Sequence, residues 1–469
     1  PLAAALAEAR DAAGRVADSV LESDPASARL ARSIRDDAAR AADALSALPR
    51  SQADLALRIL EGADAVLVLS PGASTAIPFD ALFPAASTGD TPRRTLAFRA
   101  EELLSTAVAS LVDTAQPIVV LTHTLPGRLL DAAGSAGSPA ARGALGAALD
   151  RLALRGVTVA EWPVALDAAR PARTRLAPDG DGRPVVWFCF GTEGASADAA
   201  ARFDAYARAV GALIDEGERV VLSVAPSARP ASGADDPVAR ALAGAGVLAD
   251  TARPLVSRVR LPEGVGYDLS RVLGSANTQT PIGRAIDNLP VALTWMTPVR
   301  LAEGAAGAEI LTVPDDGDTW AEAEWLGFAG APDDRAWSAA EPPRPNPRFD
   351  DTEGPWPVAV AVERPGMGPQ RLVVVGSPGW FFNRLAGRTT EIDGRTIAVY
   401  PGNLELLDAA VAWAAGRDDL IAAGAVARDT PRIGPMPDAR LALIRWLIIL
   451  GMPAATLLIG AALRQTLLR

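Results

Sequence analysis

The sequence predicts an α/β protein built on parallel sheets, followed by one helix that crosses a membrane. Short apolar runs bounded by turn residues recur along the chain, for example at residues 184–190 (PVVWFCF) and 371–376 (RLVVVG). Such runs are typical of strands buried on both faces of a parallel sheet. Helical patterns lie between them, and this alternation favours βαβ units. Near the C-terminus, residues 446–463 contain no charged side chain.

A chain of 469 residues is too long for one ordinary core, so we expect more than one domain. Composition shifts and turn residues suggest where the parts begin and end. The expected parts are a helical N-terminal segment (1–62), a first α/β domain (63–175), a second α/β domain (176–313), an extended acidic excursion containing Trp and Pro (314–356), and returning strands with a helix that complete the second domain (357–437).

The individual elements follow from the same patterns. The apolar positions after Ser196 fall on one helical face, which predicts a helix there. Asn403 is a good N-cap residue and predicts a helix over 403–415. Strands are predicted at 65–69, 117–122, 184–190, 219–225, 357–361 and 371–376.

The apolar C-terminal segment predicts a transmembrane helix over 441–464. Its uncharged part, 446–463, would span roughly 27 Å as a helix, enough for a thin hydrocarbon core. Arginines flank both ends, Trp446 suits the headgroup level, and Pro453 is tolerated in membrane spans. Because the flanking arginines balance, charge does not indicate the orientation. The alternative is a helix buried in the core of the last domain.

Composition excludes several functions. The net charge of −11, without a basic block, argues against nucleic acid as a partner. The chain contains no lysine, so a P-loop that grips ATP and a Schiff base to pyridoxal phosphate are both excluded. We expect no cofactor. With a single cysteine and a single histidine, the chain is poorly supplied with zinc ligands, and no metal site is predicted.

Cys189 and His123 could form a thiol nucleophile with its general base. Bulky apolar residues flank Cys189, however, which is typical of a buried cysteine that packs like a small hydrophobic residue. The sequence therefore predicts no catalytic residue, and a cryptic thiol hydrolase stays an alternative.

Two further features could bind a ligand. Gly191 and Thr192 follow a predicted strand and precede a helix, where backbone N–H groups could hold an anion; a plain turn is the simpler interpretation. Aromatic side chains of the excursion could stack on a sugar or a partner surface, or could anchor the excursion to the sheet. These are Trp320, Trp325, Trp337 and Trp356.

Taken in order, several motifs over residues 60–469 resemble the GldG family, the auxiliary component of ABC-type systems linked to gliding motility and of related uncharacterised transport systems. Ala100 replaces a glycine of the family's F-R-G-E-E segment, and the family's G-H-G-E-like turn is eroded. The segments that carry the resemblance are Phe98–Glu102, Leu121–Thr124, Phe203–Tyr206, Gly217–Leu222, Leu242–Val247, Val374–Ser377, Gly402–Asn403 and Val411–Gly416.

The resemblance implies a fold like that of class I glutamine amidotransferases, without their catalytic residues. It implies a non-enzymatic subunit anchored in the inner (cytoplasmic) membrane, with its soluble region on the extracytoplasmic side. Its partners would be an ABC permease and a separate ATPase, and a carbohydrate-like ligand would bind at the carboxyl ends of the strands. A purely structural envelope protein is another alternative. The candidate binding residues are Arg99, Glu101, Glu102, His123, Gly191 and Thr192.

Overall fold

The computed structural model divides the chain into two units, 1–428 and 429–469, and every residue it describes belongs to the first. The predicted membrane segment, 441–464, lies outside the described residues. No helix among the described residues is long and apolar enough to span a bilayer. The described residues are 10–16, 27, 29–36, 39–40, 65–69, 74–78, 82–83, 85–86, 95–96, 100–112, 116–131, 136–176, 182–193, 196–261, 264–326, 344–364, 370–392 and 395–421.

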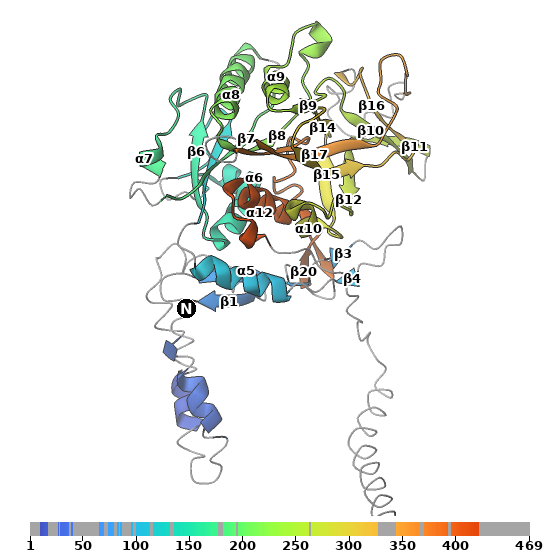
Figure 1. Ribbon diagram of the computed structural model, residues 1–469. Coiled ribbons are helices and arrows are strands. Elements are labelled where there is room, and N and C mark those ends of the chain that lie inside the picture. The colour runs from blue at the N-terminus through green and yellow to red at the C-terminus, as the bar shows by residue number, and fades with distance from the viewer. Residues whose placement is uncertain are drawn as a thin grey trace, which may run out of the picture. The chain divides into compact units, whose positions relative to one another are not determined.

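A mainly parallel sheet lies at the centre of the first unit (Figure 1), in the order β15-β17-β18-β8-β7-β5-β6. Neighbours from β18 to β6 pair in parallel, whereas β17 is antiparallel to both β18 and β15. The predicted α/β class is thereby confirmed. The strands are β5 (Ile118–His123), β6 (Thr158–Pro163), β7 (Val185–Phe190), β8 (Arg219–Ser223), β15 (Gly307–Val313), β17 (Trp356–Arg364) and β18 (Gln370–Val375).

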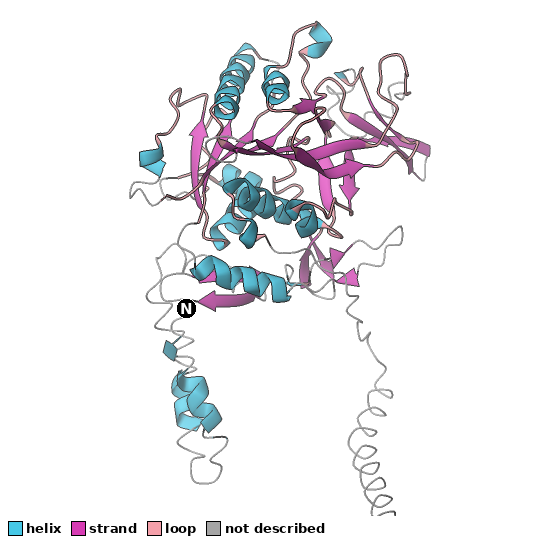
Figure 2. Cartoon of the chain, in the orientation of Figure 1, coloured by secondary structure: helices cyan, strands magenta, loops and turns pink. Residues whose placement is uncertain are grey.

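Helices cover both faces of this sheet (Figure 2), which is why its inner strands are largely apolar. Every residue of β5 and of β7 is buried. One face packs on α6 (Pro139–Leu154), α10 (Pro281–Ile286) and α12 (Pro401–Ala415). The other packs on α8 (Ala197–Asp215) and α9 (Pro237–Gly244).

The helix expected after Ser196 is present as α8. The Ser196 side chain caps it by accepting a hydrogen bond from the Ala199 N–H group. Phe203, Tyr206 and Val210 are buried against the sheet, as their helical spacing indicates.

The sheet continues across the boundary expected between residues 175 and 176. Strand β5 pairs with β6 on one side and with β7 on the other, so strands from both expected α/β domains belong to one layer. The reason is topological: the chain leaves β5 for the sheet edge and then returns to the opposite side of β5.

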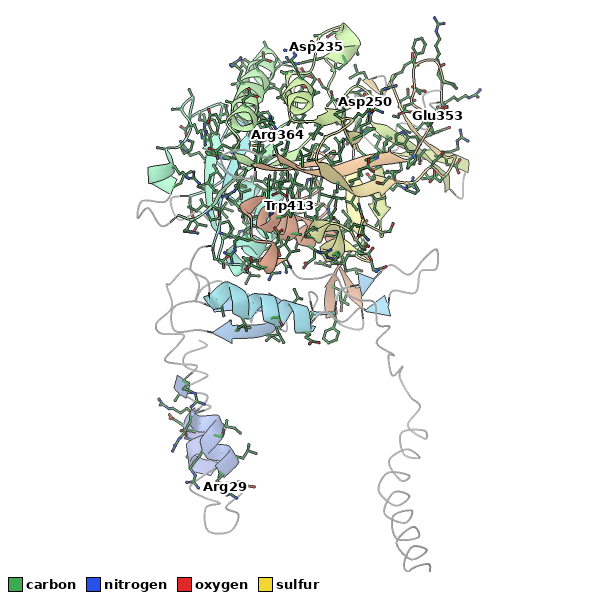
Figure 3. The ribbon with its side chains drawn as sticks, in the orientation of Figure 1. Arg29, Asp235, Asp250, Glu353, Arg364 and Trp413 are labelled. Atoms are coloured by element: carbon green, nitrogen blue, oxygen red, sulfur yellow. The ribbon has the colours of Figure 1, made fainter. Side chains whose placement is uncertain are left out.

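The prediction that Asn403 caps the last helix was wrong. Helix α12 begins at Pro401, and Asn403 is fully buried inside its first turn. Its side chain instead exchanges hydrogen bonds of 2.8 Å with both backbone groups of Ala292 and donates one of 2.6 Å to the Trp380 carbonyl. Further along α12, Trp413 (labelled in Figure 3) lies 4.9 Å beneath the Arg371 guanidinium.

Smaller antiparallel sheets complete the described fold. The expected excursion contributes β16 (Thr319–Ala321), which pairs with β10 (Leu255–Leu261), and its described tryptophans, Trp320, Trp325 and Trp356, are buried. The remaining elements are β1 (Ala65–Leu69), β2 (Ser74–Pro78), β3 (Ala85–Ala86), β4 (Thr95–Leu96), α5 (Ala100–Val112), α7 (Arg173–Leu176), η1 (Pro230–Ser232), β9 (Val247–Ala249), β11 (Gly264–Asp268), β12 (Ser270–Leu273), β13 (Val291–Thr294), β14 (Val299–Leu301), β19 (Thr389–Ile392), β20 (Arg395–Ala398) and η3 (Asp418–Leu420).

Candidate ligand-binding cleft

The strand order creates a switch point between β5 and β7. After β5 the chain moves outward to β6, and after β7 it moves in the opposite direction to β8 and then β18. In open α/β sheets the connections diverge at such a point, and ligands bind beyond the carboxyl ends of the strands there. His123 ends β5, and Gly191 with Thr192 follows β7. The structure therefore brings these three predicted residues to the same edge of the sheet.

Gly191 allows the ends of β5 and β7 to meet closely. A Cβ atom at this position would lie 2.7 Å from Cγ2 of Thr124 and 3.1 Å from the Tyr206 ring. These distances are shorter than normal carbon–carbon contacts. Glycine is thus required here by space, and Thr192 beyond it is exposed.

A cleft of about 550 Å³ opens beside these strand ends. Its volume lies within the range of small-molecule sites. Loops that follow β7, β8 and β18 line it, together with one turn of α6 and two tryptophans from outside the central sheet. The lining residues are Gly143, Ala144, Thr192, Glu193, Ala225, Pro226, Trp295, Trp325, Pro378, Phe382 and Arg384.

Three aromatic side chains form the apolar part of the cleft. Trp295 and Trp325 contact each other edge to face, with ring centroids 5.7 Å apart. The Trp325 indole N–H donates a 2.9 Å hydrogen bond to the Ala252 carbonyl, which fixes that ring. Phe382 packs on Phe381 at 4.7 Å. The aromatic wall is therefore held in place by contacts that do not involve a ligand.

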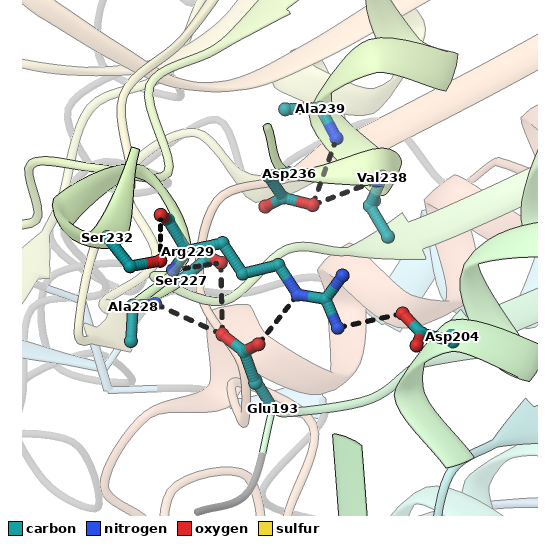
Figure 4. A network of polar contacts seen from close by, with 9 residues as sticks. All are labelled: Glu193, Asp204, Ser227, Ala228, Arg229, Ser232, Asp236, Val238 and Ala239. Atoms are coloured by element: carbon teal, nitrogen blue, oxygen red, sulfur yellow. Dashed lines mark hydrogen bonds and ion pairs between the residues drawn. The ribbon is translucent and has the colours of Figure 1, made fainter. Parts of the chain in front are cut away.

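Glu193, the acidic residue of the described cleft lining, is hydrogen-bonded to other residues of the protein (Figure 4). The Glu193 carboxylate accepts hydrogen bonds from the Ser227 hydroxyl and the Ala228 N–H group, both 3.1 Å long, and from Arg229 at 2.7 Å. Arg229 also donates to Asp204, and these acceptors raise its pKa, Glu193 most of all. Glu193 is therefore a structural anion that fastens the β8 loop to the β7 loop.

Arg384 is the cationic group of the cleft. This residue is exposed, and it forms no ion pair or hydrogen bond with the residues that the structure describes. A Cβ atom on Gly379 would lie 2.9 Å from Nη2 of Arg384 and 3.0 Å from the Phe382 ring. The glycine therefore leaves room for the guanidinium beside Pro378, at the wall of the cleft.

His123 is buried below this edge rather than exposed in it. Its ring stacks on Phe190 at 5.6 Å, and its Nε2 atom lies 3.8 Å from an oxygen of Glu161. Glu161 accepts hydrogen bonds from the N–H groups of Leu129 and Leu130, at 2.7 and 2.9 Å. Burial raises the pKa of Glu161, but the neighbouring His123 ring and these two N–H groups lower it by more. The Glu161 carboxylate therefore holds the loop after β5 in place.

Cys189 and His123 do not form a pair. In the register of β5 and β7, Cys189 lies opposite Thr122 and His123 lies opposite Phe190, so the two side chains point to opposite faces of the sheet. Burial also raises the pKa of the Cys189 thiol to about 12. The arrangement thus lacks the contact between base and thiol that a nucleophilic dyad requires.

The other candidates lie elsewhere. Glu101 is exposed on α5 and is not part of the described cleft lining, while Arg99 and the Glu102 side chain lie outside the described residues. Of the predicted tryptophans, Trp325 is in the cleft, Trp320 and Trp356 are buried away from it, and Trp337 is not described. The described part of the chain contains no cluster of three or more metal-ligating side chains.

A larger cavity, of about 910 Å³, runs along the edge strand β6. Two of its cations are already paired with acids: Arg128 donates two hydrogen bonds, of 2.8 and 2.9 Å, to the Asp167 carboxylate, and Arg170 forms ion pairs with Glu216 and Glu218. Its described lining contains no aromatic side chain and no residue from the loops after β7, β8 and β18. We therefore regard the smaller cleft as the better candidate.

Sequence reasoning missed Trp295, Phe382 and Arg384. Trp295 follows a short strand, β13, that periodicity does not reveal. The run Pro378–Phe382, directly after a predicted strand, is a signal that could have indicated Phe382, because residues after a parallel strand lie at the ligand-binding edge.

Comparison with known proteins identifies no family. No family model matches the chain, and no curated protein matches it. A solved structure titled "mmIFT52 N-terminal domain" is similar with 12% identity, over 63% of this chain and 97% of that chain, at a TM-score of 0.35. A TM-score this low does not establish a common fold.

Proposed function

We propose that the chain is a non-enzymatic, ligand-binding auxiliary subunit of an ABC-type transport system. The observation that carries this proposal is the cleft with Trp295, Trp325 and Phe382 at the carboxyl ends of β7, β8 and β18. Aromatic faces at this edge suit a carbohydrate-like ligand, since sugar rings present apolar C–H faces that stack on them. The chain contains no lysine to complete a P-loop, which supports a separate subunit as the ATPase.

The remaining parts of the proposal rest on sequence. The segment 441–464 anchors the protein in the inner membrane, and the α/β body is extracytoplasmic and of the class I glutamine amidotransferase-like type. A separate permease and ATPase are its partners, in keeping with the resemblance to the GldG family. The helices on both faces of the parallel sheet support the α/β part of this proposal.

Purification of the tagged full-length chain from its native membrane in mild detergent tests the subunit function. We expect a multi-span permease and a P-loop ATPase to be recovered with it in stoichiometric amounts. A chain recovered alone, after crosslinking in intact cells as well, would contradict the proposal. A variant cut after residue 428 is the matched control, because it keeps the first unit and lacks the predicted anchor.

A further inference from the structure

The charges around the cleft indicate what kind of sugar it takes. Among the lining residues that the structure describes, the one acid, Glu193, already accepts hydrogen bonds from Ser227, Ala228 and Arg229. It therefore has little capacity left to bind a cationic ligand. Arg384, by contrast, has no partner among the described residues, although its guanidinium offers several donors in a planar fork. Within the described lining the cleft thus presents one available charge, and that charge is positive.

The position of Arg384 places this charge beside the aromatic wall. It follows Phe382 by two residues in the loop after β18, and both side chains approach Gly379. A Cβ atom built on Gly379 would lie 3.0 Å from the Phe382 ring and 2.9 Å from Nη2 of Arg384. An acidic group on a ring that stacks against Phe382 would therefore lie within reach of the guanidinium.

We propose that the cleft binds an anionic sugar, with Arg384 recognising its carboxylate or phosphate group and the aromatic side chains contacting its ring. This inference rests on the proposed ligand-binding function and narrows the ligand class. A guanidinium pairs with a carboxylate or with a phosphate through two parallel hydrogen bonds. Arg384 therefore selects for an anionic sugar but does not distinguish a carboxylate from a phosphate.

Isothermal titration of the full-length protein in detergent with glucuronate, glucose 6-phosphate and glucose tests the inference. We expect one or both anionic sugars to bind at least about tenfold more tightly than glucose, since a charge-assisted hydrogen bond supplies that much. Comparing the affinity for glucuronate with that for glucose 6-phosphate shows whether the cleft prefers a carboxylate or a phosphate. The variant R384Q should remove the preference, and 0.5 M salt should weaken it.

The matched control is R388Q, which alters an exposed arginine of the same loop that is not in the cleft lining. It should leave all three affinities unchanged, and equal melting temperatures of the variants would exclude a folding defect. Glucose bound as tightly as the acids, or an unchanged preference in R384Q, would overturn the role of Arg384 while leaving a sugar-binding subunit intact. Absence of heat with all three sugars would overturn the anionic-sugar proposal, and the recovery of a permease and an ATPase decides the subunit function separately.

Discussion

The Nε2 atom of His123 lies 3.8 Å from a carboxylate oxygen of Glu161, and both side chains are at least nine-tenths buried. At this distance the two groups interact electrostatically and are too far apart for a hydrogen bond. Glu161 is also held by the backbone of Leu129 and Leu130. Glu161, on β6, thus contacts both His123 at the end of β5 and the backbone of the loop that follows β5.

Glu161→Gln should lower the free energy of unfolding and make it less dependent on pH in the acidic range. The pKa of Glu161 is below its ordinary value of 4.5 in the folded protein, so its contribution is fully present above 4.5 and is lost as the pH falls through the lower folded value. At pH 7 we expect a loss of about 1–3 kcal/mol, because the buried N–H groups lose a charged acceptor. Urea unfolding at several pH values measures both effects. Glu303→Gln, at an exposed turn, should change neither.

Gly191→Ala should destabilise the protein by about 1–3 kcal/mol, since its Cβ atom would overlap Thr124. Thr124→Ala removes both Thr124 atoms that lie closest to that Cβ. The double variant should therefore be less destabilised than the sum of the single ones, which a double-mutant cycle measures by thermal unfolding. Simple additivity would show that the ends of β5 and β7 do not meet as described.

Much of this arrangement was predictable from sequence. The runs at 117–122, 184–190, 219–225 and 371–376 became β5, β7, β8 and β18 because strands buried on both faces are largely apolar. The run at 65–69 became β1, which pairs with β2 in a separate sheet. Asn403 shows where local rules fail: its preference for a helix cap was overridden by the backbone groups of Ala292, more than one hundred residues away in sequence. Trp295 and Arg384 were missed for the same reason, since only the folded sheet brings their loops together.

Native Cys189 should resist thiol reagents. It is fully buried, and burial raises the pKa of its thiol to about 12, so almost none of it is thiolate at pH 8. We expect no reaction with Ellman's reagent in the folded protein and one thiol per chain after denaturation. Rapid modification of the folded protein would revive the thiol-hydrolase alternative.

Asn403→Leu should destabilise the protein by about 2–5 kcal/mol, because three buried backbone groups lose their partner. Asn403→Asp keeps the shape but places a carboxylate against the carbonyls of Ala292 and Trp380. Its loss of stability should be smaller at pH 4 than at pH 7, where the carboxylate is ionised. Denaturant unfolding compares the two variants. A Leu variant as stable as the parent would show that the side chain does not join α12 to β13.

Hydrogen–deuterium exchange with and without a saturating anionic sugar tests the central claim most directly. The account predicts slowed exchange in the loops after β7, β8 and β18, at residues 191–193, 225–228 and 378–384, which surround the cleft. Protection confined to residues 158–161 and 167–172, along the cavity beside β6, would contradict it and would place the ligand in the larger cavity instead.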